Sequence, residues 1–163
     1  NLAQLLQETN RLAEAEPLYL EALEKQRRVR GDGDVNTLTT INNLGSLWVA
    51  QGRYAEAITL LAPAEAAMRA ASGGPNAARQ VAKLLASLGK ARQGAGDVEA
   101  AEAALREAHA LYVQARGAGH AETRDCAQAL ADHYAARHER APEMGYDGKA
   151  AQWRGQAATP AES

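Results

Sequence analysis

The sequence contains no phenylalanine, and aromatic residues make up only 4 % of its 163 positions. Its core must therefore be built mainly from alanine and leucine, which favours close helix-to-helix packing over a sheet sandwich. Alanine is also the strongest helix former, and β-branched residues are sparse. The composition predicts an all-α fold, and the length suits a single domain.

Cysteine and long apolar runs are equally scarce. Cys126 is the only cysteine, so the chain forms no internal disulfide, and a reducing compartment fits this best. The simplest interpretation of Cys126 is a small buried hydrophobe. No run of about 18 apolar residues occurs, and residues 1–4 lack the basic-then-apolar order of a signal peptide. We expect a cytoplasmic protein without a membrane partner, and a first residue other than methionine indicates a fragment.

The chain also lacks a strong charge of either sign. Its formal net charge is −2 and its hydrophobic fraction is 46 %. This balance argues against a general grip on nucleic acid and against disorder. We therefore expect a protein partner rather than a nucleic acid.

What the sequence does contain is a repeat. Residues 1–6 read NLAQLL and residues 43–48 read NLGSLW, a shift of 42 positions. The match continues with RLAEA at 11–15 against RYAEA at 53–57. Fixed periods of this length are typical of stacked supersecondary units.

A third copy and the connecting loops keep the same register. Leu88-Gly89 lies 44 positions after Leu44-Gly45. The glycine of the later loop, Gly117, lies 86 positions after Gly31, which is the two shifts combined. A register that holds over the chain is stronger evidence for a repeat than any single motif.

Each copy predicts a helical hairpin. Apolar residues at spacings of three and four indicate a first helix of about a dozen residues, a tight turn and a longer second helix. A glycine inside a helix costs about 1 kcal/mol relative to alanine. A small residue nevertheless occupies the same place in each helix, which predicts that two backbones approach each other closely there. These small residues are Ala3, Gly45, Gly89 and Ala131 in the first helices, and Ala15, Ala57, Ala101 and Ala150 in the second helices.

The expected helix ends agree with this division. Gly31 and Gly117 follow second helices, where a residue that tolerates positive φ is favoured. Thr37, Asn76 and Thr123 are the candidate N-caps of the first helices that follow.

The second copy resembles the tetratricopeptide repeat, in the 42-residue form found in kinesin light chains and in many bacterial signalling proteins. The residues that carry the resemblance are Leu44-Gly45, Trp48, Gly52, Tyr54, Ala57, Leu61 and Ala64. The resemblance covers nearly the whole chain, although the third copy has Arg92 where an aromatic residue is usual. The fourth copy keeps Leu130-Ala131 and Tyr134, and its ending resembles repeat regions attached to bacterial serine/threonine kinases.

The resemblance implies a right-handed superhelical solenoid of antiparallel helix pairs. We expect one domain at 1–157 with about four repeats, the first and last incomplete, and a flexible tail at 158–163. The expected repeats are approximately 1–36, 37–75, 76–122 and 123–157.

In such solenoids the first helices line a concave face that serves as an extended binding surface. The faces of these helices that packing leaves free are expected to bind the partner through Asn1, Gln4, Thr39, Asn42, Asn43, Ser46, Lys83, Ser87, Lys90 and Gln128. By resemblance, Asn1 and Asn43 stand where the family often places a peptide-gripping asparagine, because an amide both donates and accepts hydrogen bonds. Lys83 and Lys90 are two turns apart on one face and suit acidic groups on a ligand.

Other interpretations stay open. These residues equally suit a solvated polar surface, and Asp125 and Asp132, on the same faces, are interpreted as plain solvent-facing charges. The leading hypothesis is a non-catalytic scaffold that binds a peptide or protein, including an acidic one. The alternatives are a C-terminal regulatory region of a bacterial serine/threonine kinase or similar signalling enzyme, and a module that self-associates as a homodimer through the uncovered first repeat.

Patterns that would carry chemistry are missing. His133 and His138 are five apart and so do not form an i, i+4 metal pair. The segment 31–34 begins like a calcium loop but lacks the later bidentate glutamate. No Ser/His/Asp or Cys/His set has supporting context. We expect no catalysis, no metal, no cofactor and no nucleic-acid partner.

Overall fold

The computed structural model describes residues 2–71 and 76–160, and every regular element in these ranges is helical. The all-α prediction is therefore confirmed. The elements are α1 (Leu2–Glu8), α2 (Leu12–Arg30), α3 (Val35–Ala50), α4 (Tyr54–Ala71), α5 (Ala77–Ala95), α6 (Val98–Arg116), α7 (Ala121–Arg140), a 3-10 turn η1 (Pro142–Met144) and α8 (Tyr146–Ala157).

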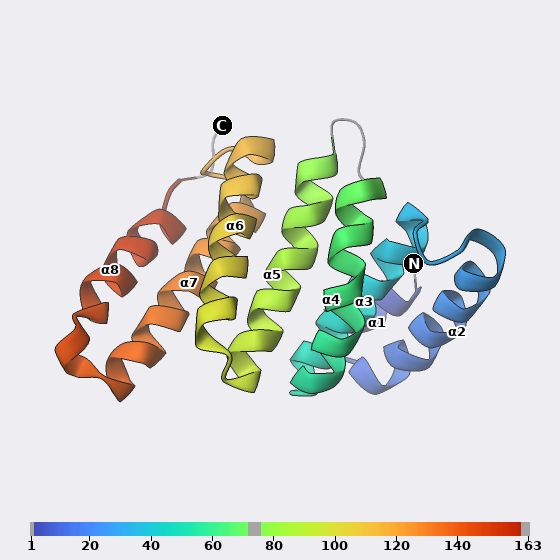
Figure 1. The fold of residues 1–163 in the computed structure, drawn as a ribbon, viewed down its shortest axis with the longest axis horizontal. Helices are drawn as coiled ribbons and strands as arrows, with labels where there is room; N and C mark the ends of the chain where they lie inside the picture. Colours follow the sequence, from blue (N-terminus) through green and yellow to red (C-terminus); the bar gives the residue numbers. More distant parts are fainter. Residues whose placement is uncertain (1, 72–75, 161–163) are drawn as a thin grey trace.

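Consecutive helices pair as antiparallel hairpins, and the hairpins stand side by side in chain order (Figure 1). α1 pairs with α2, α3 with α4, α5 with α6 and α7 with α8. Among the described residues, α3 packs on α5 and, less extensively, α5 packs on α7, and an ion pair between Arg69 and Glu107 joins α4 to α6. The stacked hairpins form the solenoid that the sequence predicts.

The crossings inside the hairpins are as close as the small residues predict. A Cβ atom added to Gly45 would lie 2.6 Å from Leu61 of α4, and one added to Gly89 would lie 2.7 Å from Leu105 of α6. Both partners are shifted by 44 positions, so the two crossings are equivalent. The contact that glycine permits offsets its cost inside a helix.

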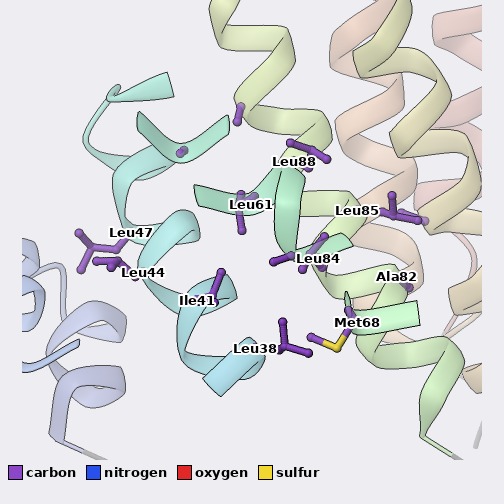
Figure 2. Packing of buried hydrophobic residues seen from close by; sticks show 14 of the residues in the cluster. Leu38, Ile41, Leu44, Leu47, Leu61, Met68, Ala82, Leu84, Leu85 and Leu88 are labelled. Carbon is purple, nitrogen blue, oxygen red and sulfur yellow. The ribbon is translucent and has the colours of Figure 1, made fainter. Parts of the chain in front are cut away.

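The core lies between the two layers and is built from leucine and alanine. Figure 2 shows Leu61 and Leu84 close together between α4 and α5, whereas Leu44 and Leu47 project from the opposite side of α3; all four belong to one buried cluster. Full burial of one leucine stabilises the fold by roughly 1.5–3 kcal/mol. The fully buried leucines of these three helices are Leu38, Leu44, Leu47, Leu61, Leu84, Leu85 and Leu88.

Glycines end two of the second helices, as the sequence predicts. Gly31 follows α2 with φ of 81°, and Gly117 follows α6 with φ of 84°. Each N–H donates to a carbonyl of the last turn, at 3.0 and 2.9 Å respectively. The chain is thereby released from the helix and turns toward the next hairpin.

The predicted N-caps are wrong at two of three first helices. Asp34 caps α3, because its carboxylate accepts from two backbone N–H groups of the first turn at 3.0 and 3.4 Å. His120 caps α7 through Nδ1, at 3.3 Å. Thr37 and Thr123 lie inside these helices and are buried. Asn76 does precede α5, but its side chain makes no capping hydrogen bond.

A partly buried carboxylate joins the first two hairpins. Glu16 of α2 accepts a hydrogen bond from Trp48 Nε1 at 2.8 Å and from Arg53 Nη1 at 2.6 Å. Gln51 Nε2 also donates to it, at 3.3 Å. We call these four residues the Glu16 clasp.

The same arrangement joins the last two hairpins. Glu102 of α6 accepts from the Tyr134 hydroxyl at 2.6 Å and from Arg137 Nη1 at 2.7 Å. Arg137 also donates to the Tyr146 hydroxyl of α8, at 2.7 Å. We call these four residues the Glu102 clasp. Glu102 and Tyr134 are 32 positions apart, as are Glu16 and Trp48.

Two leucines at the start of the solenoid face solvent. Leu2 and Leu5 of α1 are 62 % and 56 % exposed and lie three positions apart on one helical face. Self-association through this face stays a prediction, as do the repeat boundaries. Of the expected tail at 158–163, positions 161–163 lie outside the described residues. No helix of the described chain is long and apolar enough to cross a membrane.

Candidate functional site

The layer of first helices carries three adjoining hollows, of about 100, 210 and 300 Å³. Lys83 lines both the first and the second hollow, and Val49 and Lys90 line both the second and the third. We call these three neighbouring hollows together the groove, and its walls come mainly from α3, α5 and α7. Small side chains at its centre, Ser46, Ala86 and Ser87, leave the space open.

The α5 wall of the groove is basic. Arg79, Lys83, Ser87 and Lys90 follow one another at intervals of four, four and three positions, so they share one helical face. Lys83 is partly buried, and its Nζ donates to Asn43 Oδ1 across the groove at 3.2 Å. Burial and the neighbouring charge of Arg79 both lower the pKa of Lys83.

The α7 wall is acidic. Glu122 accepts two hydrogen bonds from the Arg79 guanidinium, both at 2.9 Å, which ties α7 to α5 at one end of the groove. Burial acts to raise the pKa of Glu122, but the hydrogen bonds and charge of Arg79 outweigh it and lower the pKa. Asp125 and Asp132 are exposed farther along the wall, and Asp132 accepts from Gln128 at 2.8 Å.

The floor of the central hollow is apolar. Cys126 is 2 % exposed, and its thiol donates to the Leu105 carbonyl at 3.4 Å. Burial raises the pKa of Cys126 to about 12, so the thiol stays protonated at neutral pH. Tyr112 of α6 lies beside it and is also buried. The interpretation of Cys126 as a small buried hydrophobe fits this environment.

The structure brings most of the expected partner-binding residues together. Those that line the groove or contact a residue lining it are Thr39, Asn42, Asn43, Ser46, Lys83, Ser87 and Lys90. Gln4 and Gln128 are exposed on α1 and α7 and line none of the three hollows. Asn1 lies outside the described residues.

Asn42 differs from the expectation in one respect. The sequence places it on a solvent-facing surface, but its side chain is only 2 % exposed. Successive helical residues point about 100° apart, so Asn42 and Asn43 cannot share one orientation. Asn43 accepts from Lys83 across the groove, and Asn42 is one of the residues that line the smallest hollow.

Several groove residues were missed by the sequence reasoning. Arg79 and Gln80 line the smallest hollow, and Glu122 and Tyr112 line the central one. Arg79 lies one turn before Lys83 on the same helical stripe, which is a signal that the sequence offers. Tyr112 belongs to a second helix, so a search confined to first helices misses it.

Within residues 2–71 and 76–160, no group of three or more His, Cys, Asp or Glu side chains is arranged to hold a metal ion. The charged groups of the groove are spread along two walls instead of converging on one point. The arrangement suits recognition of an extended ligand by hydrogen bonds and charge.

Comparison with known proteins finds a matching family model and similar solved structures. Residues 1–71 match the family model described as Tetratricopeptide repeat. The chain is similar to the nearly identical TPR-like repeats of a Podosopora anserina protein described as a kinesin light chain, at 18 % identity and a TM-score of 0.38, with 96 % of this chain and 90 % of that chain covered. A single-substitution variant of those repeats gives 16 % identity, a TM-score of 0.39 and coverage of 95 % and 92 %. No curated protein sequence matches the chain.

Proposed function

The chain carries repeats of the tetratricopeptide family, matched over residues 1–71, and on this premise we propose that it binds an extended segment of a protein partner in the groove of its first helices. Repeats of this family generally mediate protein–protein interaction and typically act as non-catalytic scaffolds. The groove supplies a long surface with donors, acceptors and charges along it, which suits a peptide better than a compact small molecule.

The observation that carries the proposal is that two lysines of the groove lack a nearby carboxylate. Lys83 and Lys90 line the groove, and among the described residues neither has a carboxylate within 4.0 Å. The neighbouring Arg79, by contrast, is paired with Glu122. A partly buried ammonium whose hydrogen-bond partner is a neutral amide gains from a carboxylate brought by a ligand. The α5 wall therefore favours acidic side chains on the part of the partner segment that lies against it.

The α3 wall is suited to holding the backbone of such a segment. Asn43 and Ser46 present an amide and a hydroxyl that both donate and accept hydrogen bonds. Asn43 already accepts from Lys83, so its amino group is left to bind a backbone carbonyl of the ligand. An amide and a hydroxyl bind the main chain of a ligand whatever its sequence. The two lysines then add selectivity for acidic side chains.

A random linear peptide library displayed on phage tests the proposal directly. We expect acidic peptides to be enriched on the unmodified chain. The double substitution Lys83→Glu and Lys90→Glu should weaken their binding by about tenfold or more, because two attractive pairs of roughly 1 kcal/mol in total become repulsive. Binding is measured by fluorescence anisotropy with the selected peptides.

The matched control is the double substitution Arg28→Glu and Arg154→Glu. Both arginines are exposed on second helices, α2 and α8, and the change in net charge is the same. We expect this variant to bind the selected peptides within about twofold of the unmodified chain. An equal loss in both variants would show a general charge effect, and enrichment of no peptide at all would refute the proposed function.

A further inference from the structure

The two charged walls of the groove correspond position by position. The small residues named for α5 and α7 lie 42 positions apart, so the same shift relates equivalent residues of the two helices. It places Asp125 at the position of Lys83, and Asp132 at the position of Lys90. We call Lys83 with Asp125, and Lys90 with Asp132, the two rungs of the groove. Each rung has a cation on the α5 wall and an anion on the α7 wall.

All four charges of the rungs are open to a ligand in the groove. Lys83, Lys90 and Asp125 line the central hollow, and Lys90 and Asp132 line the next one. Lys83 is partly buried and the other three side chains are exposed. Burial is the main cause of the raised pKa of Cys126 beneath the central hollow, the charge of Lys90 opposes the rise, and the charge of Asp125 adds to it. Lys90 and Asp125 therefore both act on the floor of this hollow.

The opposite charges of the rungs do not neutralise one another. Among the described residues, no side chain of a rung has an oppositely charged group within 4.0 Å. At one end of the groove, by contrast, Arg79 reaches Glu122 with two hydrogen bonds of 2.9 Å. Between the rungs the side chains are small, with Ser87 on α5 and Ala129 on α7. The walls therefore present a row of cations and a row of anions with open space beside them.

The spacing of the rungs indicates the conformation of a chain that contacts both. The rungs are seven positions apart on each helix, or about 10.5 Å at a rise of 1.5 Å per residue. A polyproline II segment returns a side chain to the same side every three residues, after about 9.3 Å. A β-strand does so after about 6.7 and 13.4 Å, and neither distance matches. An α-helix matches at i, i+7, but it is about 10–12 Å wide, and two of its turns fill far more than the central hollow of 210 Å³.

We infer that the groove binds a polyproline II segment in which an acidic and a basic residue stand next to each other and recur after three residues. The two acidic side chains pair with Lys83 and Lys90 on the α5 wall. The two basic side chains pair with Asp125 and Asp132 on the α7 wall. The third residue of each repeat points out of the groove and is not selected. This assignment rests on the proposed function and adds to it that the bound segment carries both charges in a fixed order.

Two synthetic peptides of equal composition, PEKPEKP and PEEPKKP, test the order of charges. Both have capped ends, and their prolines favour the polyproline II conformation. Only PEKPEKP places both acidic residues on one side and both basic residues on another. We therefore expect it to bind the full chain about tenfold more tightly than PEEPKKP, as measured by fluorescence anisotropy with labelled peptides. Equal affinities, or no binding of PEKPEKP, would overturn the inference.

Reversing the charge of the α7 wall should exchange the preference of the groove. The double substitution Asp125→Lys and Asp132→Lys makes both walls cationic. We expect it to weaken binding of PEKPEKP about tenfold and to tighten binding of PEEPEEP by a similar factor. An unfolded variant would bind neither peptide, so the gain for PEEPEEP identifies a change in specificity.

The matched control for the α7 wall is Glu24→Lys with Glu99→Lys. Both glutamates are exposed on second helices, α2 and α6, and the change in net charge is the same. We expect this variant to bind both peptides within about twofold of the unmodified chain, as expected of surface charges remote from the ligand. A wall variant that behaves like this control would overturn the inference.

The phage selection distinguishes failure here from failure of the proposed function. Selected peptides that depend on Lys83 and Lys90, but bind the Asp125→Lys and Asp132→Lys variant unchanged, would overturn the inference and leave the proposed function standing. Enrichment of no peptide, together with no binding of PEKPEKP, would refute both.

Discussion

The junctions between successive hairpins are held in two different ways. At the outer junctions, α2 to α3 and α6 to α7, the Glu16 and Glu102 clasps bridge the hairpins. At the central junction, α4 to α5, the equivalent positions are Ile58 and Arg92, and Arg92 donates only to the Ala100 carbonyl of its own hairpin, at 3.5 Å. The central junction therefore has no clasp at this place, and it combines apolar packing with an ion pair between Arg69 of α4 and Glu107 of α6, at 2.8 Å.

That packing is close at the point where a clasp is missing. Gly94, near the end of α5, lies against the ring of Tyr54, and a Cβ atom at Gly94 would overlap the ring. Most of the inward face of α5 is fully buried, from Val81 to Ala91. The difference teaches that a solenoid can join its repeats either by a polar clasp at a half-buried edge or by steric fit.

The largest effect is expected from breaking a clasp. Glu102→Ala removes the only carboxylate that accepts from the Tyr134 hydroxyl and from Arg137 Nη1, so we expect a loss of about 2–3 kcal/mol in the free energy of unfolding, although Arg137 Nη2 keeps the Tyr146 hydroxyl. Glu16→Ala should cost less, because Arg53 keeps Glu56 as a partner at 2.6 Å. Urea unfolding followed by circular dichroism measures both. The exposed Glu24→Ala is the control, expected within about 0.5 kcal/mol of the unmodified chain. A Glu102→Ala value in that range would show that the clasp contributes little.

A smaller effect is expected from disturbing the steric fit at the central junction. Gly94→Ala forces the Tyr54 ring to move, and overpacking of this kind costs about 1–2 kcal/mol even though alanine favours the helix. Gly148→Ala in α8 is the matched control, because a Cβ atom there meets nothing within 4 Å. It should stabilise the chain by about 0.5–1 kcal/mol in the same urea experiment. If both variants are stabilised, the Tyr54 ring moves at little cost, and the central junction is packed less tightly than its contacts indicate.

The smallest effect is expected from building the missing clasp. Ile58→Glu and Arg92→Trp place a carboxylate and an indole where the first junction has Glu16 and Trp48. We expect each single substitution to destabilise the chain, and the pair to show a favourable coupling of about 0.5–1.5 kcal/mol in a double-mutant cycle. Additive losses would mean that the backbones at the central junction lie too far apart or too close for a clasp.

Much of the fold follows from local sequence signals. The small residues at fixed places predicted close helix crossings at Gly45 and Gly89, because only a residue without a long side chain permits such an approach. The structure adds that the residues they meet are Leu61 and Leu105. The N-caps were harder to predict. Asp34 and Thr37 both suit a cap, and propensity does not decide between two candidates three positions apart. The first turn in fact begins at Asp34, which buries Thr37.

The groove could be predicted in part. A shared helical stripe placed Lys83, Ser87 and Lys90 together, since positions three and four apart face the same way. The pairing of Arg79 with Glu122 joins residues 43 positions apart in different hairpins. Whether a given charge is neutralised at such a distance depends on the spacing of helices, which no local pattern contains.

The sequence by itself determined the helices, the hairpin period and the side chains that allow close crossings, because these depend on propensity, periodicity and size within one repeat. Only the tertiary structure decided that Asn42 is buried and that, among residues 2–71 and 76–160, Asn42 Oδ1 has no donor and Lys83 and Lys90 have no carboxylate partner. Both properties depend on the distance between neighbouring hairpins, and burial and charge pairing are set by that distance and not by any residue alone.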